Sequence, residues 1–162
     1  MNIPTAQILP VFFAAMQNGY AGGASKSIIS ELPGSKVIRY KQGDFEVVDC
    51  YFVTPHSDFS FGTTTIYYQG NAVWMMQYRG RYPKDMISFL KQALRQTYDK
   101  SEFVGGRGPA EYAEGDNSGL VYVNKLMSAD WRNFSGREEI WHNHGQGSTL
   151  KGWHEYAGLL LV

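Results

Sequence analysis

Runs of β-branched and aromatic residues, separated by turn residues, are the feature of this chain that most limits its fold. Side chains of this kind favour strands, and turn residues such as Gly43 and Gly70 between adjacent runs favour hairpins. The pattern therefore predicts antiparallel meanders in both halves of the chain. The predicted strands cover residues 36–40, 44–53, 63–69 and 72–78 in the first half, and 110–114, 119–127, 137–144 and 150–158 in the second.

Two segments show helical periodicity instead. After Pro83, apolar residues recur at the spacing of one helix face, with polar residues between them. They are Met86, Phe89, Leu90, Ala93, Leu94 and Thr97. A weaker stripe covers 6–18, where Pro10 must lie in the first turn or kink the helix.

The order of these features repeats along the chain. Each predicted helix is followed by an aromatic residue and a double glycine, at 20–23 and 103–106. Further on, Gly62 to Ile66 corresponds to Gly136 to Ile140, and Trp74 to Gly80 corresponds to Trp153 to Gly158. We therefore expect an α+β fold made by tandem duplication of a helix plus a four-stranded antiparallel meander. The repeats would cover about 5–82 and 83–162, and the two halves would share one core within a single domain, 1–162.

Charge and cysteine content narrow the functional classes. The 162 residues include 15 Lys and Arg and 15 Asp and Glu, so the formal net charge is zero. Without a basic excess, we expect no direct binding to nucleic acid or to an anionic membrane. Cys50 is the single cysteine, which excludes an internal disulfide and favours a reducing compartment. With no membrane-spanning apolar run and no basic leader, the expectation is a cytoplasmic protein.

The segment WHNHGQG, 141–147, raises the question of a metal site. In an extended strand His142 and His144 point to one face, and His154 on the returning strand can complete a three-nitrogen set for zinc or another divalent transition metal. Against this reading, surface histidines beside glycine-rich turns are usually solvated. The preferred expectation is therefore no metal and no cofactor, with the histidine set as the alternative.

The segment GGRGPAEY, 105–112, combines glycines with an arginine. Such a loop can cradle an anion. It follows a helix, however, whereas phosphate loops precede one. The favoured reading is that Gly105 and Gly106 cap the helix, while Arg107 pairs with an acid of the sheet, Glu138 first.

Aromatic residues stand at corresponding places in the two halves. They are Trp74, Tyr78, Trp153 and Tyr156. Such residues can line a pocket between the halves, or they can be core.

Several of these segments together resemble a bacterial family classed as a domain of unknown function. Its most distinctive features here are Arg107-Gly-Pro109 and the Phe134 to Ile140 motif. The resemblance also covers 31–40, 44–52 and 61–80. Such domains occur alone or C-terminal to helix-turn-helix (XRE-type) regulators. The resemblance therefore implies an association with transcription regulators but no established activity. This chain departs from the pattern at Thr64, where an acid is expected, and at Leu159, where a second glycine is expected.

Three functions follow as expectations. The first is a non-catalytic module that binds a small molecule or a protein segment through the aromatic residues, with Arg107 and Glu138 as polar anchors. The second is a metal-assisted hydrolase using the three histidines, with Glu138 as base. The third is a structural or oligomer-forming domain that uses exposed strand edges.

Overall fold

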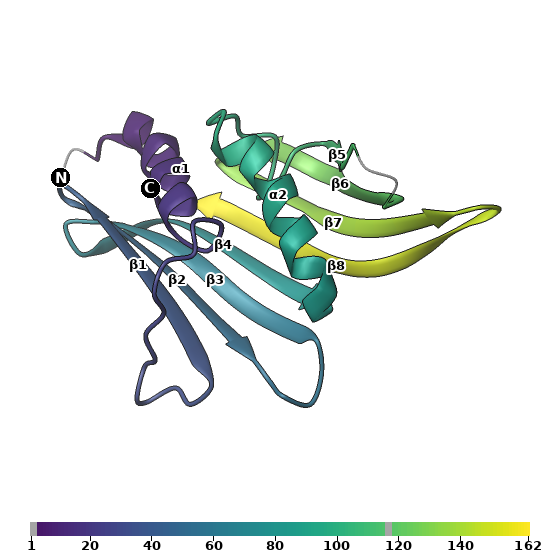
Figure 1. The fold of residues 1–162 in the computed structure, drawn as a ribbon. Helices are drawn as coiled ribbons and strands as arrows, with labels where there is room; N and C mark the ends of the chain where they lie inside the picture. The colour runs from purple at the N-terminus through teal and green to yellow at the C-terminus, as the bar shows by residue number, and fades with distance from the viewer. Residues whose placement is uncertain (1–2, 116–117) are drawn as a thin grey trace.

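The computed structural model describes residues 3–115 and 118–162. Within them the chain forms eight strands, two α-helices and two short 3-10 turns (Figure 1). The elements are η1 Thr5–Gln7, α1 Ile8–Asn18, β1 Ser35–Gln42, β2 Phe45–Val53, β3 Phe59–Tyr68, β4 Asn71–Arg81, η2 Lys84–Met86, α2 Ile87–Tyr98, β5 Glu111–Ala113, β6 Leu120–Asp130, β7 Asn133–His144 and β8 Gly147–Leu160. Every predicted strand and both predicted helices are present, although several boundaries differ by a few residues.

All eight strands belong to one antiparallel sheet, in the order β1-β2-β3-β4-β8-β7-β6-β5. Its centre is the pairing of β4 with β8, in which Tyr78 lies opposite Tyr156. The predicted fold class is wrong: the strands do not form a helix plus four-stranded meander repeated twice. Hydrogen bonds between β4 and β8 join the strands of both halves into one continuous sheet, which two short helices accompany. Strand β5, at one edge, has only three residues.

Both helices lie on the same face of the sheet, which curves around them (Figure 1). The predicted stripe of α2 is buried from Phe89 to Thr97. Phe12 of α1 packs against Trp74 of β4, with ring centroids 5.3 Å apart, and Trp74 stacks on Phe134 of β7 at 5.5 Å. These aromatic contacts connect the helices to both sides of the sheet centre and form the main hydrophobic core.

The two helices also contact each other through polar groups. Gln17 donates from Nε2 to the Tyr98 carbonyl at 2.6 Å, and Arg95 donates to the Ala21 carbonyl at 2.7 Å. These bonds hold the end of α2 and the segment that follows α1 together. In the described part of the chain, no helix is long and apolar enough to cross a membrane.

Candidate functional site

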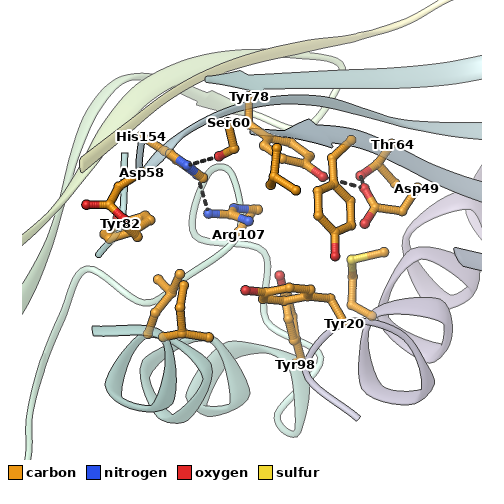
Figure 2. A pocket seen from close by; sticks show the side chains of 15 residues that line it. Tyr20, Asp49, Asp58, Ser60, Thr64, Tyr78, Tyr82, Tyr98, Arg107 and His154 are labelled. Atoms are coloured by element: carbon orange, nitrogen blue, oxygen red, sulfur yellow. Dashed lines mark hydrogen bonds between the residues drawn. The ribbon is translucent and has the colours of Figure 1, made fainter. Parts of the chain in front are cut away.

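A cavity lies between the helices and the concave face of the sheet (Figure 2). Its volume is about 110 Å³. For comparison, an apolar protein cavity of roughly 150 Å³ accommodates benzene. Residues from both halves of the sheet, both helices and four connecting segments line it. They are Met16, Tyr20, Asp49, Tyr51, Val53, Asp58, Ser60, Thr64, Tyr78, Tyr82, Ile87, Leu90, Tyr98, Arg107 and His154.

The cavity opens to solvent beside the connection between β2 and β3. Val53, at the end of β2, is 38% exposed, and Asp58 in the connection is also exposed. The opposite wall is closed, because Arg107 and His154 are buried. A molecule entering past Val53 would therefore meet a buried cationic group at the inner end.

Arg107 forms the inner wall together with Glu138 of β7. Its Nη2 donates to Glu138 Oε1, and Glu138 is fully buried. Tyr122 donates to the second carboxylate oxygen at 2.8 Å. Burial alone would raise the pKa of Glu138, but the guanidinium of Arg107 outweighs burial and the pKa falls to about 2, so the carboxylate is ionised. The ion pair expected from the sequence is formed.

The loop that carries Arg107 is fixed by close contacts with the sheet. Gly106 has φ +73°, and a Cβ there would lie 2.4 Å from the Tyr156 ring. At Gly108 a Cβ would lie 2.1 Å from the Tyr122 hydroxyl. Asn124 donates to the Gly105 carbonyl at 2.8 Å. The glycines therefore let the backbone lie against two tyrosines and thereby position Arg107.

The prediction that Gly105 and Gly106 cap the preceding helix is wrong. Helix α2 ends at Tyr98 with Asp99 as its C-cap, whose N–H donates to the Arg95 carbonyl. Several residues separate that cap from the glycines. The physical reason for the glycines is the close approach to the sheet, which sequence spacing alone does not distinguish from a cap.

His154 of β8 connects Arg107 to Ser60 of β3. Its Nδ1 lies 2.8 Å from Arg107 Nη2, and its Nε2 lies 3.1 Å from Ser60 Oγ (Figure 2). A guanidinium can only donate, so Nδ1 accepts and the proton is assigned to Nε2, which donates to Ser60. Burial lowers the pKa of His154, which favours this neutral form.

Asp49 of β2 is the acidic group on the far side of the cavity. Thr64 donates to its Oδ1 at 3.0 Å, and Tyr78 donates to the same oxygen at 2.8 Å. Burial raises the pKa of Asp49, and the hydrogen bonds from these two hydroxyls oppose that rise only in part. One carboxylate oxygen of Asp49 therefore accepts two hydrogen bonds within the protein before any ligand binds.

Tyrosine hydroxyls complete the polar lining. Tyr20 and Tyr98 direct their hydroxyls into the cavity from the helix side, as Figure 2 shows. Burial raises the pKa of both phenols, so both are protonated donors at neutral pH. Their rings, with those of Tyr78 and Tyr82, also supply flat apolar surface.

The six residues predicted to bind a ligand lie in different places. Arg107 and Tyr78 line the cavity, and Glu138 lies behind Arg107. Trp74 is fully buried core, and Tyr156 donates to Asn124 at 2.6 Å beneath the loop. Trp153 lies on the opposite face, where Arg137 packs over its ring at 4.2 Å.

The expected aromatic interface is therefore not assembled. On β8, Trp153 and Tyr156 are an odd number of residues apart, so they face opposite sides of the sheet. Trp74 pairs with Leu160, and Trp153 pairs with Arg81. The segment Trp74 to Gly80 is one residue longer than the corresponding segment Trp153 to Gly158. Because of that difference, Trp153 faces the side of the sheet opposite to Trp74.

The three histidines of the alternative metal set do not come together. His154 pairs with Glu138, while His142 pairs with Thr149 further along the same ladder. The rings of His142 and His144 lie 5.4 Å apart, and His144 contacts Thr149 at the end of the hairpin. No group of three or more potential metal-binding His, Cys, Asp or Glu side chains occurs among the described residues.

Several cavity residues were not predicted as site residues. Ser60, Tyr82 and Tyr98 carry no motif, and each reaches the cavity through tertiary packing of its strand end or helix. The sequence did contain one indication of the site. Because Asp49 and Cys50 are neighbours on β2, their side chains must face opposite sides of the sheet. Asp49 faces the helices, whereas Cys50 is half-buried and lines a hollow of the other face.

Comparison with known families gives one match. The model of a domain of unknown function (DUF5680) matches residues 49–158. The chain therefore belongs to this family, and the match includes Asp49, Arg107, Glu138 and His154. No curated protein and no solved structure gives a significant match.

Proposed function

We propose that this protein is a non-catalytic module that binds a small molecule in the cavity between its helices and its sheet. The observation that carries the proposal is a cavity of about 110 Å³ that ends at the buried guanidinium of Arg107. Binding sites are concave and largely apolar, with a few polar groups that fix orientation. Met16, Ile87 and Leu90 supply the apolar part of this lining.

The hydrogen bonds around His154 favour binding over catalysis. Ser60, His154 and Glu138 lie in an order that could suggest a nucleophile, a base and an acid. However, Nδ1 of His154 is closer to Arg107, at 2.8 Å, than to Glu138, at 3.5 Å. Since Nδ1 accepts from Arg107, Nε2 carries the proton and has no lone pair to take the proton of Ser60.

The biological setting is also a proposal. The resemblance noted from the sequence favours a bacterial protein that works alongside helix-turn-helix regulators, and the neutral composition and single Cys50 favour the cytoplasm. A small-molecule cavity would suit a domain that senses an effector. We propose no metal, no cofactor and no direct contact with nucleic acid.

Saturation-transfer NMR tests the proposal with four probes of one-ring size: benzoate, benzyl alcohol, benzylamine and toluene. The informative variant is Val53→Trp, because Val53 lines the cavity mouth and is 38% exposed. The matched control is Phe52→Trp, because Phe52 is 37% exposed and its side chain points to the other face of the same strand.

We expect at least one probe to bind the unaltered protein and Phe52→Trp, and to lose its signal with Val53→Trp. The proposal is overturned if no probe binds, or if every bound probe keeps its signal when the mouth is blocked. Circular dichroism establishes that both variants remain folded.

A further inference from the structure

Hydrogen-bond donors dominate the inner part of the cavity. Arg107 donates through Nη2 to Glu138 and His154, while its Nε has no partner among the described residues. Tyr20 and Tyr98 add two hydroxyls for which the described residues provide no acceptor. An acceptor-rich group in the cavity would use these two hydroxyls.

The charges beside the Tyr20 wall of the cavity also favour an anion. Lys91 Nζ lies 4.8 Å from the centre of the Tyr20 ring, and Lys26 Nζ lies 5.5 Å from it. Both cations therefore stand beside the same wall of the cavity. Burial raises the pKa of Tyr20 and Tyr98, and the nearby charge of Arg107 opposes that rise. A negative group at these hydroxyls would be attracted from two sides.

Acidic groups do not offset this arrangement at the inner end. Glu138 is held by Arg107 and Tyr122, and Asp49 accepts from Thr64 and Tyr78. Burial favours the neutral form of Asp49. Asp58 lies at the exposed mouth, where solvent screens its charge.

The remaining lining limits the rest of the ligand. Met16, Val53, Ile87 and Leu90 present apolar surface, and the volume of about 110 Å³ is suited to one ring or a short branched chain. A large polyanion would leave charges against these side chains without donors.

We propose that the ligand is a small apolar monocarboxylate whose carboxylate accepts from Arg107 and from the hydroxyls of Tyr98 and Tyr20. This inference rests on the ligand-binding function proposed above and names its ligand class. The carboxylate would lie at the inner end, and its apolar body would extend toward Val53 between α2 and the sheet.

Calorimetric titration of the full chain at neutral pH tests the inference with benzoate, benzyl alcohol and benzylamine. These probes share a ring and differ in the charge of one substituent. We expect benzoate to bind at least tenfold more tightly than the alcohol, and the amine to bind most weakly. Because hydrogen bonds to a charged group contribute about 1.5–3 kcal/mol, Tyr98→Phe should weaken benzoate binding by about tenfold or more. It should leave the affinity for benzyl alcohol nearly unchanged.

The matched control is Tyr112→Phe. Tyr112 is half-buried, and its hydroxyl donates to Gln92, away from the cavity. This variant should bind benzoate as the unaltered protein does. Equal or tighter binding of the alcohol or the amine overturns the carboxylate assignment while leaving the cavity as a ligand site. Unchanged benzoate affinity in a folded Tyr98→Phe also overturns it. If none of the probes binds, both this inference and the proposed function fail.

Discussion

The guanidinium of Arg107 lies over the ring of Tyr78, with its central carbon 4.9 Å from the ring centroid. Tyr78 in turn donates to Asp49, so one aromatic residue separates the cationic end of the cavity from its acidic side. A cation over an aromatic face is stabilised by electrostatic attraction to the ring. This stacking, the ion pair with Glu138 and the contact with His154 fix Arg107 from three directions.

Glu138→Gln should destabilise the protein strongly. The substitution leaves Arg107 buried without its counter-charge, and the removal of one partner of a buried pair costs about 3–5 kcal/mol. Urea unfolding measures the change. The control is Glu155→Gln, whose carboxylate pairs with Arg79 and Arg137 at the surface and is 39% exposed. Its loss should cost less than about 1 kcal/mol. Equal losses of unfolding free energy in the two variants would contradict a larger contribution from the buried ion pair.

Acid should unfold the protein partly through the same carboxyl group. The pKa of Glu138 is about 2 in the folded protein, below its ordinary value of 4.5. The unfolded chain therefore takes up this proton first as the pH falls, and stability is lost between about pH 4.5 and 2. The free energy of unfolding, measured across that range, should fall less steeply for Glu138→Gln than for the unaltered protein. Parallel slopes would contradict the assignment of a buried, ionised Glu138.

Asp49→Asn should stabilise the protein at neutral pH. Burial raises the pKa of Asp49 above its ordinary value of 3.8, so the folded state binds this proton more tightly than the unfolded state. The stabilising contribution is thus present at low pH and is lost as the pH rises through the folded pKa. An asparagine keeps an acceptor for Thr64 and Tyr78 without the buried charge. The thermal midpoint at pH 7 should rise, whereas Asp44→Asn at an exposed position should change it little. A lower midpoint for Asp49→Asn would refute this reading.

Gly106→Ala should disturb the loop that carries Arg107. The residue has φ +73°, and the added methyl group would lie 2.4 Å from the Tyr156 ring. Gly145→Ala is a matched control, because its φ is +53° but no atom lies within 4 Å of the added carbon. Both variants carry the backbone cost of about 1–2 kcal/mol. The overlap in Gly106→Ala should add about 1–3 kcal/mol in chemical unfolding. Similar losses in both variants would mean that the loop can move away from the sheet.

Local sequence patterns predicted the elements well but not their assembly. Runs of β-branched and aromatic residues bounded by turn residues located the strands, because side chains of these types favour extended backbone. The pairing of β4 with β8 joins residues far apart in the chain, and nothing in either strand specifies that neighbour. The expected duplication therefore failed as a description of the fold, because similar order along the chain does not determine how strands combine in a sheet.

The candidate site was predictable from the sequence at Arg107 and Glu138, where a charge needs a partner, and at Tyr78 from the aromatic pattern. A buried arginine needs an acid, and this requirement identified Arg107 with Glu138 correctly. The alternative histidine set is not assembled, because His142 and His144 lie close together while His154 lies further along the same ladder. The tyrosines of the cavity lie on separate elements, and no local spacing marks Tyr20, Tyr82 and Tyr98 as neighbours.

An NMR titration of protein labelled with ¹³C in its tyrosine rings would locate the ligand most directly. With benzoate as the probe, the rings of Tyr20, Tyr82 and Tyr98 should shift together, because all three line the cavity. Tyr67 on the opposite face and Tyr112 near α2 should keep their positions. Saturable shifts confined to the tyrosines that line the cavity would establish binding beside Arg107. The absence of shifts at those rings, or saturable shifts at Tyr67 instead, would contradict the cavity as the ligand site.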